Sequence, residues 1–155
     1  MNDILAPFIG SLLDRGLVDL KIDGNSDEHF NNRLKLQKYV FLAKYYGLDM
    51  KYDFNMYLHG PYSQALATDY YALAKKPQIL VKPTNTIISD KFFETVTHKD
   101  IDWLEAASTL LSLNKTFRDR QSLLDRTITM KEHISSEKIK SVLADLDYSK
   151  LISFE

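Results

Sequence analysis

The turn His59-Gly60-Pro61-Tyr62-Ser63 gathers the side chains of this sequence whose types suit chemistry best. A histidine, a tyrosine and a serine can exchange protons or bind polar groups, and a rigid Gly-Pro turn would hold them in place. Each residue also has a sufficient structural role, because Gly60 and Pro61 set the backbone of a turn and Ser63 can cap a helix. We therefore expect a strand-to-helix connector. If the turn has a role beyond this connection, His59 and Tyr62 would recognise an acidic or main-chain group at the N-terminus of the following helix, rather than take part in a reaction.

The sequence contains four histidines and no cysteine, which limits its metal and nucleophile chemistry. The histidines are not paired at the short spacings of metal-binding motifs: His29, His59, His98 and His133. The sequence also lacks a glycine-rich phosphate loop, a nucleophile elbow and a tight carboxylate pair on an apolar background. We therefore expect no catalytic residue, no metal, no cofactor and no enzymatic activity.

Eight of the nine tyrosines lie between residues 33 and 73. Buried tyrosines would build a core with their hydroxyl groups at its rim, whereas exposed ones would form a surface rich in a residue common at binding hot spots. We predict structural roles for Tyr39, Tyr52 and Tyr70. We predict that two or three of the remaining five are exposed and, with His59, bind a partner: Tyr45, Tyr46, Tyr57, Tyr62 and Tyr71.

The apolar spacing predicts a helix, a strand, a turn and a second helix in this segment. Residues 33–46 read as a helix that is apolar on most sides, and Gly47 can end it in the left-handed conformation. Residues 50–58 alternate between apolar and polar side chains, which is typical of a half-buried strand. Ser63 is placed to cap the second helix.

The rest of the chain predicts further helices and a minor strand component. A helix near the N-terminus should end at Gly16, and the polar loop over residues 21–32 should supply Asn31 or Asn32 as the cap of the next helix. Residues 78–88 read as a small hairpin. The C-terminal half reads as helices, with a cap at Asp100. We expect a mainly α, single domain over residues 1–155.

Length and charge set the broad class of protein. The chain has 155 residues, 45% of them hydrophobic, and a net charge of −1. A domain of this size can bury a hydrophobic core, and the balanced charge disfavours a protein whose main function is to bind phosphate groups. No apolar run approaches the ~20 residues that span a bilayer, and we expect no secretory signal. A cytoplasmic protein that does not bind membranes is the expectation.

Three motifs together resemble the Panacea/SocA-like antitoxin domain superfamily, and most closely its uncharacterised YwgA-like branch. They are KLQKYVFLA from Lys35 to Ala43, YDFNMYLHGPYS from Tyr52 to Ser63, and LATDY from Leu66 to Tyr70. The resemblance covers about a third of the chain. It implies a compact, mostly helical domain without a cofactor, and the role of an antitoxin or adaptor that holds a toxin or a protease substrate. The motif residues that match the family are Lys38, Gly60, Pro61, Ser63 and Asp69.

The leading hypothesis is a non-enzymatic protein-interaction module, either a monomer or a homodimer, that uses tyrosines near the His59–Ser63 turn. The alternative is a nucleic-acid-binding protein with a winged-helix-like unit. In that alternative, four lysines would contact phosphates: Lys75, Lys76, Lys82 and Lys91. The expected recognition helix, QALATDYYALA, disfavours this reading because it carries Asp69 and no basic residue.

Overall fold

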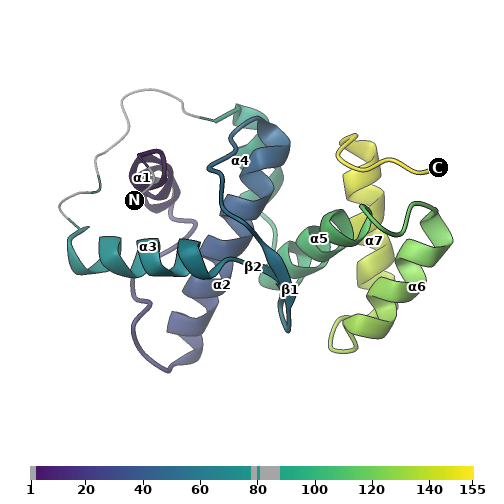
Figure 1. Cartoon of the computed structure of the whole chain (residues 1–155), viewed down its shortest axis with the longest axis horizontal. Coiled ribbons are helices and arrows are strands. Elements are labelled where there is room, and N and C mark those ends of the chain that lie inside the picture. The colour runs from purple at the N-terminus through teal and green to yellow at the C-terminus, as the bar shows by residue number, and fades with distance from the viewer. Residues whose placement is uncertain (1–2, 78–79, 81–87) are drawn as a thin grey trace.

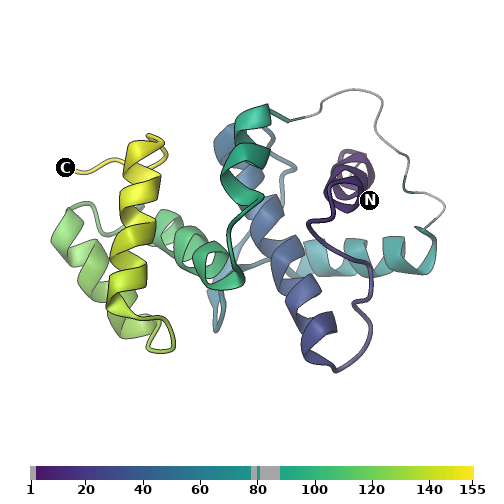
Figure 2. The same cartoon turned by 180° about the vertical axis from the view of Figure 1, so that it is seen from behind.

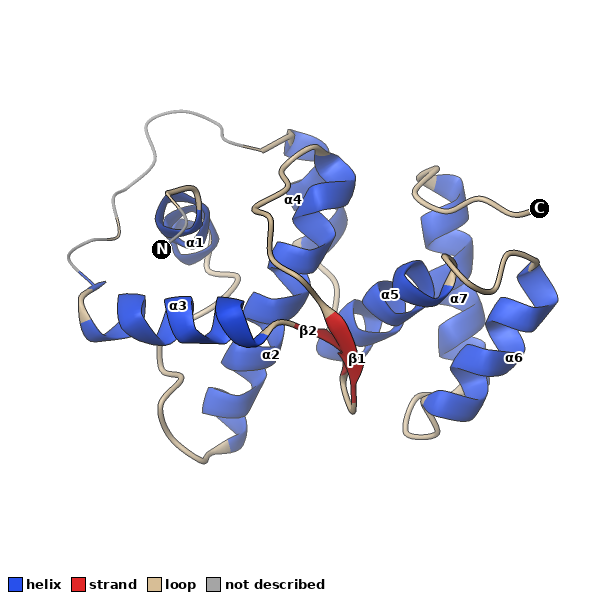
Figure 3. Ribbon diagram, in the orientation of Figure 1, coloured by secondary structure: helices blue, strands red, loops and turns tan. Residues whose placement is uncertain are grey.

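The computed structural model of the chain describes residues 3–77, 80 and 88–155. Within these ranges a single two-stranded antiparallel hairpin lies among helices (Figure 3). The elements are α1 (Leu5–Asp14), α2 (Asp27–Ala43), the 3₁₀-helix η1 (Lys44–Tyr46), β1 (Asn55–Tyr57), β2 (Gly60–Tyr62), α3 (Gln64–Lys75), α4 (Asp90–Val96), α5 (Ile101–Leu113), α6 (Arg120–Met130) and α7 (Ser136–Tyr148). The prediction of a mainly α domain is confirmed.

Helices α2 and α5 form the centre of the arrangement. Helix α5 packs against α2, α6, α7 and strand β2, while α2 also packs against α3 and β2. Helices α1 and α3 therefore lie on one side of α2, and α5 to α7 lie on the other, with the hairpin between them (Figure 1). The view from behind shows α6 and α7 side by side at the far end of α5 (Figure 2).

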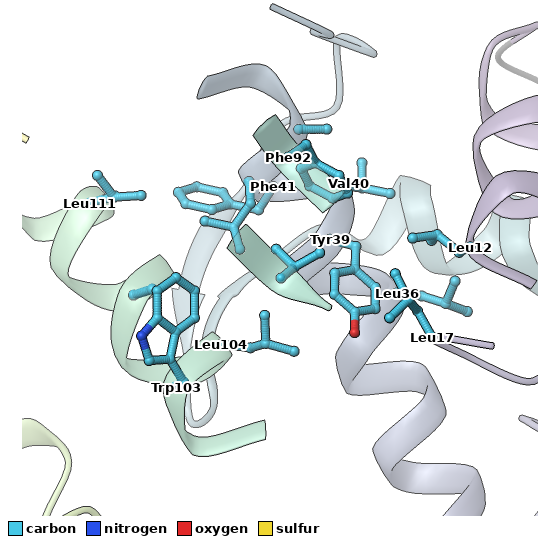
Figure 4. Close-up of a cluster of buried hydrophobic side chains, with 14 of the residues drawn as sticks. Leu12, Leu17, Leu36, Tyr39, Val40, Phe41, Phe92, Trp103, Leu104 and Leu111 are labelled. Carbon is cyan, nitrogen blue, oxygen red and sulfur yellow. The ribbon is translucent and has the colours of Figure 1, made fainter. Parts of the chain in front are cut away.

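The hydrophobic core is continuous from the N-terminal helices to the C-terminal ones. Side chains of α1, α2, α4 and α5 meet in its central part, where Phe41 and Phe92 of α2 and α4 lie near Leu104 and Leu111 of α5 (Figure 4). Phe92 also makes edge-on ring contact with Tyr39, with the ring centroids 6.3 Å apart. Burial of this apolar surface is the main term that stabilises the fold.

Several predicted helix boundaries are confirmed. Gly47 follows η1 with φ +90°, the left-handed conformation expected of a C-terminal glycine. The hydroxyl of Ser63 accepts a hydrogen bond from the Leu66 N–H at the start of α3, and the Asp100 carboxylate accepts one from the Trp103 N–H at the start of α5.

The prediction that α2 starts after Asn31 or Asn32 is wrong. The helix begins at Asp27, because Ser26 supplies the cap by accepting a hydrogen bond from the His29 N–H. Asn32 lies inside the helix and is buried. Its side chain accepts from the Asp19 N–H and donates to the Lys21 carbonyl, so it ties the preceding loop to the helix instead of starting it.

The strand predicted over residues 50–58 is shorter than the alternation of side chains indicates. Only residues 55–57 pair with another strand, and their partner is residues 60–62, the Gly-Pro segment expected to end the strand. Because the hairpin has two residues in its turn, Leu58 points away from the core and is 81% exposed. Met50 is buried as the alternation predicts.

The small hairpin predicted over residues 78–88 lies almost entirely outside the described residues. A short helix, α4, follows it, and the Ser89 hydroxyl caps that helix by accepting from the Lys91 N–H. None of the helices in the described ranges is long and apolar enough to cross a membrane.

We predict that Ser63→Ala lowers the free energy of unfolding by about 1–2 kcal/mol, because it removes a buried helix cap. Ser141→Ala is the matched control, since Ser141 is exposed in the middle of α7, where alanine is the better helix former. Urea denaturation of both variants measures the difference. Equal stabilities would contradict the role given to Ser63.

Candidate binding pocket and buried ionic cluster

The turn of the hairpin is held against the helices by two buried lysines. Lys38 of α2 donates from Nζ to the Pro61 carbonyl over 2.8 Å, and Lys131, directly after α6, donates from Nζ to the Leu58 carbonyl over 2.7 Å. Both lysine side chains are about 1% exposed. Two elements that are 93 residues apart in the chain (38 and 131) thus bind the two ends of one turn.

Glu105 of α5 lies at the centre of the charged groups around this turn and is 3% exposed. Its Oε2 lies 3.3 Å from Lys131 Nζ and 2.7 Å from His133 Nε2, and its Oε1 lies 3.2 Å from His59 Nδ1. We call Lys38, His59, Glu105, Lys131 and His133 the ionic cluster. A buried carboxylate needs such partners, because an isolated charge in the interior is strongly destabilising.

Lys38 has an unusually low pKa, mainly because it is buried. Burial lowers the pKa of Lys38 from 10.5 to about 7, with Lys131 acting in the same direction and Glu105 opposing it. A large fraction of this side chain is therefore neutral near pH 7. A neutral amine still donates to the Pro61 carbonyl, so the contact with the hairpin does not require the charge.

Gly60 allows the turn to approach the helices closely. Its φ is +97°, and a Cβ atom at this position would lie 2.9 Å from Thr109 Oγ1 and 3.1 Å from Lys38 Nζ. Both the conformation and the lack of space require glycine. The Gly-Pro pair therefore lets the strand lie directly on α5 and on the lysine that binds it.

A pocket of about 290 Å³ opens beside the turn, between α2, α3 and the hairpin. Its walls are mainly aromatic and aliphatic, which is typical of sites that bind apolar groups. The lining residues are Phe30, Arg33, Leu34, Gln37, Lys38, Tyr57, Leu58, His59, Gly60, Tyr62, Tyr70 and Tyr71.

The structure brings part of the predicted partner-binding set together at this pocket. Tyr57, His59, Tyr62 and Tyr71 all line it, and the rings of Tyr57 and Tyr62 meet edge-on with centroids 5.3 Å apart. Tyr57 is 57% exposed, whereas Tyr62 and Tyr71 are half-buried. Tyr70 contributes to the pocket floor although its side chain is buried in the core, as predicted.

Tyr45 and Tyr46 do not line this pocket and are half-buried. Tyr57 alone of the five tyrosines is therefore exposed, whereas the sequence predicts that two or three are. The ring of Tyr45 packs against Phe41, and the Tyr46 hydroxyl donates to Thr95 Oγ1. Both residues lie in η1, after the end of α2. Burial raises the pKa of both hydroxyl groups.

The motif residues hold the pocket together. The Gln37 side chain accepts from the Ser63 N–H and donates to the Ser63 carbonyl, each over 2.9 Å, so α2 fixes the start of α3. The Tyr52 hydroxyl donates to the Asp69 carboxylate over 2.6 Å, which ties the chain before β1 to α3. The structural roles predicted for Tyr39, Tyr52 and Tyr70 agree with their positions.

Sequence motifs do not place three members of the ionic cluster at the site: Glu105, Lys131 and His133. Glu105 gives a weak signal, because it is a charged residue within the apolar run WLEAA of α5. Lys131 and His133 give none, since they follow α6 in a short polar connection. Two of the four histidines converge although the spacing of histidines in the sequence does not indicate it.

Comparisons with protein-family models, with curated proteins and with solved structures found no match for this chain. The resemblance to Panacea-type domains therefore stays a prediction.

The nucleic-acid alternative also stays a prediction. Lys75 and Lys76 are exposed at the end of α3, and Lys91 is exposed at the start of α4. Lys82 and the hairpin expected to act as the wing lie outside the described residues.

We predict that Gly60→Ala lowers the free energy of unfolding by about 2 kcal/mol or more, through backbone strain and collision with Thr109 and Lys38. Gly16→Ala separates the two causes. Gly16 also has a positive φ, +70°, but a Cβ there would meet nothing within 4 Å, so strain of about 1 kcal/mol is the expected cost. Equal losses in the two variants, measured by urea denaturation, would contradict the close approach at Gly60.

We predict that raising the pH above 7 increases the free energy of unfolding of the wild type more than that of the Lys38→Met variant. The pKa of Lys38 is about 7 in the folded state and 10.5 in the unfolded state, so the unfolded state binds more protons between these values. The free energy of unfolding therefore increases with pH across this window, and the methionine variant lacks this increase. Urea denaturation of both proteins at about pH 7 and about pH 9, with a chelator present, measures it. A difference that does not change with pH would show that Lys38 keeps its charge.

Proposed function

We propose that this chain is a non-enzymatic protein-interaction module that binds a short segment of a protein partner in the pocket beside the hairpin. The observation that carries the proposal is the pairing of an apolar, aromatic-walled pocket with two exposed side chains at its edge, Tyr57 and Leu58. Tyr57 and Leu58 extend the apolar lining of the pocket onto the surface, and a contiguous apolar surface of this kind is typical of interaction sites. Tyrosine is also common at binding hot spots.

The rigidity of the pocket supports the same function. Lys38 and Lys131 hold the turn that carries His59, and Gln37 holds the start of α3. A pocket held in shape by the fold loses little conformational freedom when a ligand binds, which favours affinity from a small contact area. With about 290 Å³, the pocket suits one or two side chains of a peptide.

The charge around the pocket indicates the kind of segment that it accepts. Arg33 supplies a fixed positive charge to the lining, beside the nitrogen atoms of Lys38 and His59, and the lining includes no aspartate or glutamate among the described residues. Arg33 is held in place by hydrogen bonds to the Ile22 and Gly24 carbonyls. A segment with an apolar anchor next to a carboxylate complements this surface.

The resemblance to Panacea-type domains supports a partner of the toxin or protease-substrate class. An antitoxin or adaptor needs a preformed surface that recognises one segment, and the pocket supplies such a surface. This proposal involves no cofactor and no reaction step.

We predict that peptides selected from a random display library against the wild-type chain share an apolar residue next to an acidic one. The double variant Tyr57→Ala, Tyr62→Ala should bind a selected peptide at least about tenfold more weakly in fluorescence polarisation, because it removes two walls of the pocket.

Tyr148→Ala is the control for this experiment, because Tyr148 is 91% exposed on α7 and does not line the pocket. Its affinity should equal that of the wild type. Peptides that bind the double variant as tightly as the wild type, or a selection that yields no binding peptide, would contradict the proposal.

A further inference from the structure

Three side chains with metal-binding atoms converge at the outer side of the ionic cluster. His59 comes from the turn of the hairpin, Glu105 from α5 and His133 from the connection between α6 and α7. One nitrogen of each histidine and one carboxylate oxygen all lie within 4.8 Å of one another. We propose that these residues form a site for a single zinc ion.

One of the two separations between ligand atoms is close to that expected around zinc, and the other is shorter. Ligand atoms around a tetrahedral zinc ion, with bonds of about 2.0–2.1 Å, lie roughly 3.3 Å apart. His59 Nδ1 lies 3.2 Å from Glu105 Oε1, and His133 Nε2 lies 2.7 Å from Glu105 Oε2. Small rotations of two partly exposed imidazole rings suffice to place an ion between the three groups.

Glu105 Oε2 carries a further indication. This buried oxygen accepts no hydrogen bond from the described residues, although His133 Nε2 lies 2.7 Å from it. A buried carboxylate beside two imidazoles, with one oxygen that accepts no hydrogen bond from the described residues, is an arrangement that a cation would complete.

The surroundings of the site are consistent with this proposal. Lys131 lies 3.3 Å from Glu105 Oε2 and donates to the Leu58 carbonyl, so it fixes the carboxylate as the outer partner of a metal ligand does. The positive charge of Lys131 repels the zinc ion, and we therefore expect a zinc affinity below that of structural zinc sites. The ring of Phe30 meets the His59 ring edge-on, with the ring centroids 5.1 Å apart, and limits the orientation of the imidazole.

The donor set favours zinc over magnesium or calcium. Two imidazoles and one carboxylate suit zinc and related transition ions, whereas magnesium and calcium prefer oxygen ligands. The side chains of His59 and His133 are 38% and 50% exposed, so the ion has access from solvent. Three protein ligands leave a fourth position for water or for a donor from a partner.

Isothermal titration calorimetry of the full chain with zinc chloride tests the proposal, with magnesium chloride as the comparison. We expect one zinc ion per chain and no magnesium binding. Cobalt(II) should give the intense visible absorption of a tetrahedral ion at the same stoichiometry.

His133→Ala and His59→Ala should each weaken zinc binding by at least about tenfold, since even the loss of an outer partner of a metal ligand costs about that much. His133→Ala is the more selective of the two, because His133 does not line the pocket. His98→Ala is the matched control, because His98 is exposed after α4 and is not part of the group. It should bind zinc as the wild type does.

Circular dichroism melting in a chelator checks that each variant folds. Absence of zinc binding to the wild type would overturn the proposal. It would also be overturned if folded His59→Ala and His133→Ala variants bound zinc as tightly as the His98→Ala variant.

Discussion

The contact between a hairpin turn and two buried lysines fixes the position of the hairpin, and with it the pocket and the ionic cluster, relative to the helices. The turn carries backbone carbonyls at Leu58 and Pro61 that would otherwise lose water without gaining a partner. Lysine can reach them from α2 and from the end of α6, and Glu105 supplies the counter-charge that the buried ammonium of Lys131 needs. The arrangement therefore has three coupled requirements: a glycine at the turn, two long amine side chains, and one carboxylate on α5.

The same contact explains why the pocket and the ionic cluster are neighbours. His59 belongs to both, because the turn points its imidazole between Phe30 on the pocket side and Glu105 on the cluster side. Lys38 also belongs to both, so the apolar cavity and the group of charges share two side chains. This arrangement resembles sites in which apolar contacts give affinity and a few polar groups give orientation.

Local signals in the sequence reveal much of the fold and little of the site. Ser63, Asp100 and Gly47 mark helix ends through short-range hydrogen bonding and backbone preference, and these boundaries are confirmed. The start of α2 is missed because both Ser26 and Asn32 are good caps, and the tertiary contacts of Asn32 decide between them. The ionic cluster joins Glu105 to residues 26 to 46 positions away in the chain (Lys131, His133 and His59), which no local pattern encodes. Glu105 within an apolar helix is the one local sign that a charge is buried there.

Since Lys38 belongs to α2 and Lys131 follows α6, the position of one two-residue turn depends on the packing of both halves of the chain. Detachment of α6 would free the Leu58 carbonyl and leave Glu105 without its nearest ammonium, so the wall of the pocket would loosen with it. If the pocket binds a ligand as proposed, that binding would therefore be thermodynamically linked to the folding of the C-terminal helices. Occupancy of the pocket should slow hydrogen exchange in α6 and α7, far from any direct contact, and a partner would in this way select for the fully assembled chain.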